Sequence, residues 1–177
     1  MSGKNRKIKS AMLYRDIPVA RESVNNEART VELAFSSESP VERWFGNEIL
    51  DHGPSSVRLQ RLKDAGPLLV DHNPRDHVGV VEEVQIGSDR RGRSVVRFGR
   101  SARAEEIFRD VLDGIRTKVS VGYMIHKMVL ESKEGDSETY RAIDWEPMEI
   151  SLVSVPADPS VGVGRANEQP QHDILIE

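Results

Sequence analysis

The chain has 177 residues, of which 37% are hydrophobic and 31% charged, which is enough for one globular domain with a sizeable core. Its formal net charge of -4 gives no general electrostatic case for binding nucleic acid. It contains no cysteine, which excludes disulfides, thiolate metal sites and a cysteine nucleophile. No apolar run approaches the roughly 20 residues that span a bilayer, so we expect no membrane as a partner. Because of the net charge, we expect no nucleic acid as a partner either.

The N-terminal part of the chain predicts an arm followed by strands. Residues 1–7 are basic and lack the apolar stretch of a signal peptide, so we expect a flexible arm there. Residues 30–36 alternate cleanly, with Val31, Leu33 and Phe35 on one face, which is typical of a half-buried strand. Less regular strand patterns lie at residues 8–15 and 41–50.

The middle of the chain predicts a short helix, a buried run and a hairpin. Residues 57–64 favour a short helix that ends before Gly66 and Pro67. The apolar run that follows stops at His72. Two alternating segments, separated by a polar turn, then predict a hairpin at residues 78–86 and 94–98.

Residues 101–114 give the clearest helix signal. One continuous apolar stripe is formed by Ala104, Ile107, Phe108, Val111, Leu112 and Ile115. Ser101 is a suitable N-cap and Gly114 a suitable C′ residue.

The last part of the chain returns to strand patterns, at residues 118–123 with an extension to 130, 139–145 and 148–155. From residue 166 onward the composition is polar, and we expect a flexible C-terminal tail over 166–177. Seven or more short strands with one strong helix indicate an α+β, mainly β protein. The expected architecture is an antiparallel sheet or partly closed β-barrel with helices packed outside it.

Ser120 is the candidate nucleophile. Its neighbours Val119, Val121 and Tyr123 share one face of the predicted strand, so Ser120 and Gly122 lie on the other, which we expect to be open. The missing side chain of Gly122 would let another backbone approach the serine hydroxyl. The alternative is an ordinary half-exposed strand serine.

A serine nucleophile needs a base, and the base needs an orienting group. His72 closes an apolar run that would hold it rigidly at the edge of a cleft; the alternative is a loop histidine that caps a turn. Glu149 lies on the face opposite Met148 and Ile150, where an unpartnered carboxylate would be costly. It would suit the second N–H of His72, unless it is an exposed glutamate in a salt bridge.

A second histidine-rich cluster raises the alternative of a metal hydrolase that uses His52, His72 and His77. The spacing matches no compact metal site, and the cation of Arg75 inside the cluster disfavours a metal ion. We therefore expect no metal and no cofactor.

An ordered set of segments then resembles a known family. These segments are Leu68-Leu69-Val70-Asp71-His72, the helix from Ala102 to Ile115, Val119-Ser120-Val121-Gly122-Tyr123, and Met148-Glu149-Ile150-Ser151-Leu152-Val153-Ser154-Val155-Pro156-Ala157-Asp158-Pro159. Over residues 30–165 the chain resembles the prohead maturation proteases of tailed bacteriophages, which are related in fold to herpesvirus assemblins. The resemblance implies an antiparallel β-barrel of about seven strands with surrounding helices.

The resemblance assigns the nucleophile to Ser120 and the base to His72. Assemblins use a second histidine as third member, whereas here Glu149 occupies a comparable place, so the orienting residue departs from that pattern. Backbone N–H groups near residues 156–158 are the expected oxyanion hole, although Pro156 itself has no N–H. The protease domain would cover residues 1–165.

By the same resemblance, the chain is a serine endopeptidase that cleaves scaffold protein, major capsid protein and itself inside the assembling prohead, in the host cytoplasm. The resemblance leaves a homo-oligomer open. The alternative is a non-catalytic β-barrel module that binds capsid or scaffold protein during assembly.

Overall fold

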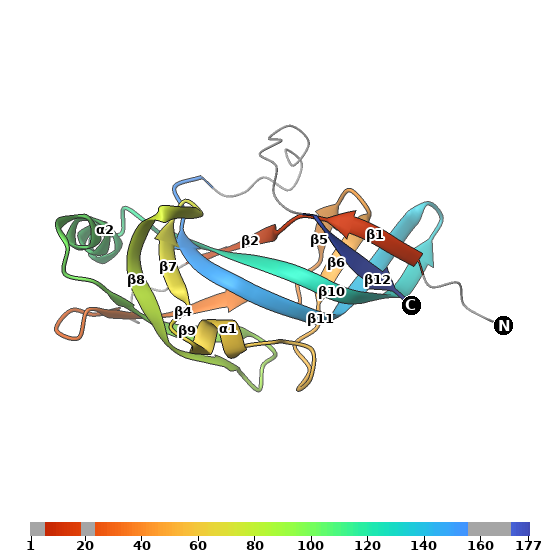
Figure 1. Ribbon diagram of the computed structural model, residues 1–177, viewed down its shortest axis with the longest axis horizontal. Helices are drawn as coiled ribbons and strands as arrows, with labels where there is room; N and C mark the ends of the chain where they lie inside the picture. Colours follow the sequence, from red (N-terminus) through yellow and green to blue (C-terminus); the bar gives the residue numbers. More distant parts are fainter. Residues whose placement is uncertain (1–5, 19–23, 156–170) are drawn as a thin grey trace.

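The computed structural model describes residues 6–18, 24–155 and 171–177, which form a mixed sheet of 12 strands and two helices (Figure 1). The strands are β1 (Arg6–Ser10), β2 (Leu13–Pro18), β3 (Val24–Asn25), β4 (Thr30–Ser36), β5 (Val41–Arg43), β6 (Gly46–Leu50), β7 (Pro67–Val70), β8 (Asn73–Ile86), β9 (Gly92–Phe98), β10 (Lys118–Glu134), β11 (Ser137–Leu152) and β12 (His172–Ile176). The helices are α1 (Gln60–Lys63) and α2 (Ala102–Leu112). Neither helix is long and apolar enough to cross a membrane.

The long antiparallel hairpin of β10 and β11 lies in the middle of the sheet and runs along the longest axis of the molecule (Figure 1). Its other neighbours attach at different points along it. β2 is antiparallel to the first residues of β10, and β12 is parallel to its middle. β7 and β6 are both parallel to β11, at its end and near its beginning.

The expected antiparallel barrel of about seven strands is wrong. The sheet runs β1-β12-β10-β11-β7-β8-β9-β4-β3, and no pairing among the described residues joins β1 to β3 and closes it. Helices do not surround it either, since α2 packs against β8 and β9 at one end (Figure 1). Alternation along a strand reports which residues are buried, but it carries no information on which strand lies beside it or in which direction.

Several expected elements are confirmed, while others have different boundaries or are divided differently. The helix at 101–114 is α2, capped by the Ser101 hydroxyl, which accepts a hydrogen bond from the Ala104 N–H at 3.2 Å. The expected strands at 139–145 and 148–155 are one strand, β11, because a bulge where Tyr123 pairs with Pro147 lets the ladder continue past the missing proline N–H. Conversely, residues 8–15 contain parts of two strands, β1 and β2.

The structure places strands in parts of the expected arm and tail. Arg6 and Lys7 belong to β1, which pairs with β12 at residues that were assigned to the flexible tail. Ile174 and Ile176 are buried, and Ile8 lies opposite Ile174 across the pair. This apolar alternation is enough to order a terminal strand when a partner is available. Residues 1–5 and 166–170 lie outside the described residues.

A buried charged cluster fixes β2 against the sheet. Arg15 of β2 donates from Nη2 to Glu48 Oε1 at 2.8 Å, and the Tyr123 hydroxyl donates to the same oxygen at 2.5 Å. Arg43 donates to the Tyr123 hydroxyl and to the Tyr14 carbonyl, at 2.7 and 2.8 Å. Burial raises the pKa of Tyr123, with a further contribution from Glu48, so its hydroxyl remains a donor. The hydrogen bond from Arg43 to the Tyr14 carbonyl therefore ties Tyr14 to this cluster.

Candidate active site

The side chains of Ser120, His72 and Glu149 form one hydrogen-bonded line. The Ser120 Oγ lies 2.9 Å from His72 Nε2, and His72 Nδ1 lies 2.5 Å from Glu149 Oε1. Because an ionised carboxylate can only accept, the proton of a neutral imidazole belongs on Nδ1. Nε2 is then free to accept the hydrogen of the Ser120 hydroxyl.

The pairing of β10 with β11 brings the serine and the glutamate together. Ser120 lies opposite Ser151, and Gly122 lies opposite Glu149, with all four positions on one face of the sheet. The Glu149 carboxylate extends over Gly122, and a Cβ on that glycine would overlap Glu149 Oε1. We had expected Gly122 to admit the backbone of a bound peptide, whereas here it makes room for the carboxylate.

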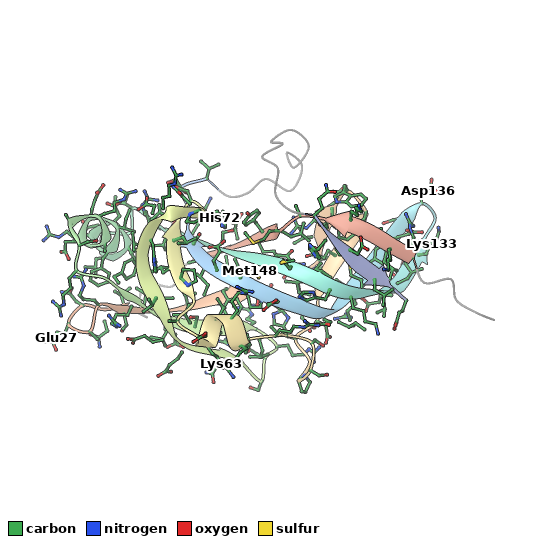
Figure 2. The ribbon with its side chains drawn as sticks, viewed as in Figure 1. Glu27, Lys63, His72, Lys133, Asp136 and Met148 are labelled. Atoms are coloured by element: carbon green, nitrogen blue, oxygen red, sulfur yellow. The ribbon has the colours of Figure 1, made fainter. Side chains whose placement is uncertain are left out.

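His72 is held by a sharp reversal between β7 and β8, at the top of Figure 2. Asp71 and His72 both have left-handed backbones, with φ of 49° and 58°, in a two-residue connection between Val70 and Asn73. Asp71 fixes this turn to the end of β11, since its N–H donates to the Leu152 carbonyl at 2.9 Å. The Tyr14 ring packs on the imidazole with centroids 4.1 Å apart.

Ser151 is a site residue that the sequence analysis did not single out. Its hydroxyl donates to Glu149 Oε2 at 2.6 Å and accepts the backbone N–H of His72 at 3.2 Å. It therefore ties the carboxylate to the turn that carries the imidazole. The strand alternation in the sequence could have identified it, because Ser151 lies on the same strand face as Glu149.

The site is more enclosed than we expected. Ser120 has 0% of its surface exposed and Glu149 5%, while the side chain of His72 is 18% exposed. Both faces of β10 are thus covered around Ser120, and the expected open face is wrong. A substrate carbonyl reaches the hydroxyl only if the side chains over it move aside.

The other candidate residues lie apart from this line. His52 Nε2 lies 2.7 Å from the Ser36 Oγ, and His77 Nε2 lies 2.7 Å from the Gly79 carbonyl. Among the described residues, no group of three or more His, Cys, Asp or Glu side chains is arranged to hold a metal ion. The expected oxyanion hole at 156–158 lies outside the described residues.

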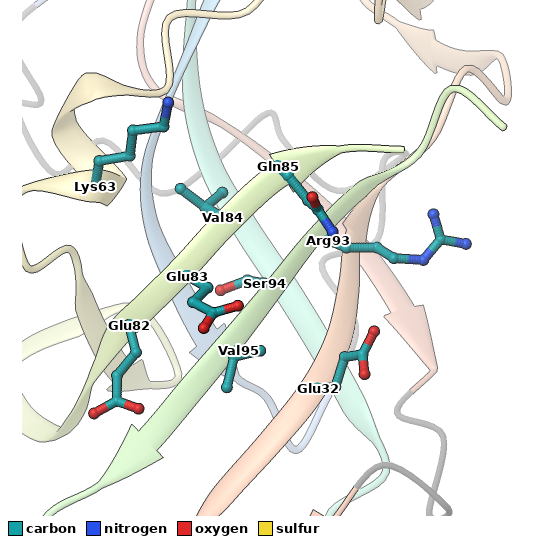
Figure 3. A pocket seen from close by; sticks show the side chains of 9 residues that line it. All are labelled: Glu32, Lys63, Glu82, Glu83, Val84, Gln85, Arg93, Ser94 and Val95. Atoms are coloured by element: carbon teal, nitrogen blue, oxygen red, sulfur yellow. The ribbon is translucent and has the colours of Figure 1, made fainter. Parts of the chain in front are cut away.

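A hollow in the described surface lies over β8, β9 and β4 (Figure 3), and none of the three site residues lines it. It is lined by Glu32, Lys63, Glu82, Glu83, Val84, Gln85, Arg93, Ser94 and Val95. Lysine, arginine and glutamate side chains are mixed around it, so it presents no single charge to a ligand.

Comparisons with known proteins identify the family to which the chain is similar. A family model described as caudovirus prohead serine protease matches residues 33–172. A protein of Halomonas phage phiHAP-1 named "Major capsid protein" is 49% identical over 147 residues, which are 81% of this chain and 24% of that relative. The chain therefore spans about a quarter of the length of this relative. No solved structure matches.

Proposed function

Because the chain belongs to the caudovirus prohead serine protease family, we propose that it is a serine endopeptidase with Ser120 as nucleophile, His72 as general base and Glu149 as orienting carboxylate. The observation that carries the proposal is the continuous line from the Ser120 hydroxyl through both ring nitrogens of His72 to Glu149. A serine hydroxyl is a weak nucleophile unless an adjacent base removes its proton.

In the proposed reaction, Ser120 Oγ attacks the scissile carbonyl while His72 Nε2 takes the hydroxyl proton. The imidazolium is stabilised by Glu149 and then gives its Nε2 proton to the leaving amine, so that the peptide C–N bond breaks and an acyl-enzyme forms. A water molecule, deprotonated by the same nitrogen, hydrolyses the ester and restores Ser120. The N–H groups of Val153 and Ser154 already donate to Lys118 O and Asp71 Oδ1, so the oxyanion donors must come from elsewhere.

The proposed substrates are scaffold protein, capsid protein and the chain itself, inside the assembling prohead in the host cytoplasm. Support comes from the family match and from a relative that is named a major capsid protein and extends far beyond the matched region. We propose that the protease domain includes β12, which pairs with β1 and β10, and that self-processing would appear as new termini of the purified chain.

The test is incubation of the purified chain with its cognate scaffold and capsid proteins, with and without a serine-directed acylating reagent. We expect cleavage that the reagent abolishes, with the label on Ser120. His72→Ala should abolish both cleavage and labelling. His77→Ala is the matched control, because the one side-chain hydrogen bond of His77 among the described residues is to the Gly79 carbonyl on its own strand. Labelling that persists in His72→Ala would remove His72 from the mechanism.

The second candidate is a non-catalytic module that binds capsid or scaffold protein. It is favoured by the complete burial of Ser120 and by the name of the relative. Under this reading the chain would form a stable complex with capsid protein, the complex would survive Ser120→Ala, and no new peptide termini would appear.

A further inference from the structure

Two rows of side chains cross the sheet at the candidate active site. Ser120 of β10 lies opposite Ser151 of β11 on one side and opposite Asp16 of β2 on the other. The next row is formed by Tyr14, Gly122 and Glu149.

Directly opposed residues of an antiparallel pair project to the same face, with Cβ atoms about 4.5–5.5 Å apart. Asp16 is therefore a direct neighbour of Ser120, on the side away from Ser151. The contact of the Tyr14 ring with His72 is independent evidence that this face of β2 is turned toward the site, because Tyr14 and Asp16 are two residues apart on one strand.

The Asp16 carboxylate lacks the partners that the other acidic groups near the site have. Its Oδ1 is buried and has no hydrogen-bond partner. By contrast, Glu149 is engaged by His72 and Ser151, and Glu48 by Arg15, Arg43 and Tyr123. None of the ion pairs among the described residues includes Asp16. A buried carboxylate oxygen without a partner is unfavourable, and most proteins avoid it unless a ligand supplies the missing group.

The position of this charge matters for the proposed reaction. A carboxylate beside the nucleophile repels the negative charge that develops on the scissile carbonyl oxygen. A cation that binds to Asp16 removes this repulsion and satisfies the buried oxygen at the same time. An acidic substrate residue at the same place would be repelled. The Asp16 carboxylate would therefore favour cationic substrate residues and disfavour anionic ones.

Resting on the proposed function, we propose that Asp16 is a specificity-determining residue that binds a lysine or arginine side chain of the substrate beside the scissile bond. The cation is assigned to the substrate because no described residue of the chain provides one. Partial exposure of Asp16 leaves a route for such a side chain from solvent.

The test uses a pooled set of synthetic octapeptides in which arginine, its neutral isostere citrulline, or glutamate occupies each position in turn, with cleavage sites read by mass spectrometry. We expect the parent to prefer arginine over citrulline by about 10- to 100-fold in kcat/KM at one position next to the cleaved bond, as for a charged hydrogen bond. Asp16→Asn should reduce this ratio to about one, and Asp16→Lys should favour glutamate at that position. Glu83→Gln is the control for the change in net charge, because Glu83 is exposed and lines the hollow of Figure 3.

A binding measurement separates failure of this inference from failure of the proposed function. The same peptides are titrated into Ser120→Ala and into Ser120→Ala/Asp16→Asn, and chemical-shift changes of the Tyr14 and His72 rings are followed. Arginine peptides that bind only when Asp16 is present support the inference even if no peptide is cleaved. Cleavage or binding with the same arginine-to-citrulline ratio in the presence and absence of the Asp16 carboxylate would overturn it, and so would the absence of any binding by arginine peptides. Thermal melts of Asp16→Asn should equal or exceed those of the parent, because the buried Oδ1 of Asp16 has no hydrogen-bond partner among the described residues.

Discussion

Among the residues that the structure describes, two serine–histidine pairs have similar distances and different surroundings. Ser120 and His72 are 2.9 Å apart, with Glu149 on the other ring nitrogen. Ser36 and His52 are 2.7 Å apart, but the other nitrogen of His52 donates to the neutral Leu50 carbonyl at 2.9 Å. The distance between hydroxyl and imidazole therefore does not distinguish the two pairs.

The surroundings of the two histidines do distinguish them. The His52 side chain has no exposed surface and its ring packs against Trp145. Burial lowers the pKa of His52, so the imidazolium that a general base must become is disfavoured. His72 is partly exposed and faces a carboxylate that stabilises the same cation. We infer that the charge of the third group and the access to the imidazole separate a catalytic pair from a structural one.

The largest expected effect comes from deleting each serine hydroxyl in turn. Ser120→Ala should lower kcat on scaffold protein by on the order of 10⁶ and leave the melting temperature nearly unchanged. Ser36→Ala should do the opposite, with parental kcat and a loss of about 1–3 kcal/mol in the free energy of unfolding, because it leaves a buried imidazole nitrogen without a partner. Single-turnover cleavage measures the loss of activity in both variants, and urea unfolding measures their loss of stability. Equal loss of activity in both would mean that Ser36 belongs to the mechanism.

The next effect isolates the charge of the third group. Glu149→Gln keeps the shape of the side chain but removes the charge, which makes the site resemble that of His52. Loss of the orienting carboxylate in a serine triad costs about 10⁴ in kcat, and we expect a somewhat smaller loss here because water has access to His72. The measurement is single-turnover cleavage of a scaffold-derived peptide beside a thermal melt. Parental activity with an unchanged melt would make Glu149 a bystander and leave a Ser120–His72 dyad.

A smaller effect is expected from Ser151, which touches no reacting atom in the proposed mechanism. Ser151→Ala removes the hydrogen bonds to Glu149 Oε2 and to the His72 N–H, and a bond to a charged group corresponds to about 10- to 100-fold in kcat. In a Glu149→Gln background the same change should cost much less, since the two residues act together. Ser94→Ala is the matched control, because the buried Ser94 hydroxyl has no hydrogen-bond partner. Equal factors in both backgrounds would indicate that Ser151 acts independently of Glu149.

The sequence singled out three residues whose side chains the structure brings together, but it did not predict the sheet that does so. Strand parity put Ser120 and Glu149 on polar faces, and the apolar run before His72 marked it as rigidly held, because these signals are local. Asp16 and Tyr14 lie close to Ser120 because β2 pairs with β10, which brings together residues about a hundred positions apart in the chain. No local periodicity in the sequence indicates such a pairing. The open sheet was missed for the same reason, since β12 and β7 join the hairpin in parallel and alternation is the same in both directions.

The smallest expected effect is a pH dependence of stability that comes from His52. Its pKa is lower in the folded protein than its ordinary value of about 6.5, so the unfolded chain binds the proton more readily. Stability from this group is therefore complete above about pH 6.5 and falls as the pH drops toward the folded-state pKa, by at most about 1.4 kcal/mol per pH unit.

The carboxylates near His52 titrate in a separate, more acidic range. Partial burial alone would raise their pKa, but hydrogen bonds from Arg90 and Ser56 hold the pKa of Glu38 and Asp51 below the usual values. Urea unfolding of the parent and of His52→Gln between about pH 7 and pH 5 thus reports His52 with little interference. The free energy of unfolding should fall less steeply on acidification in the variant, which cannot take up the proton. Identical slopes would show that His52 is protonated as easily in the fold as in the unfolded chain, and the contrast drawn between the two histidines would then rest on the carboxylate of Glu149 alone.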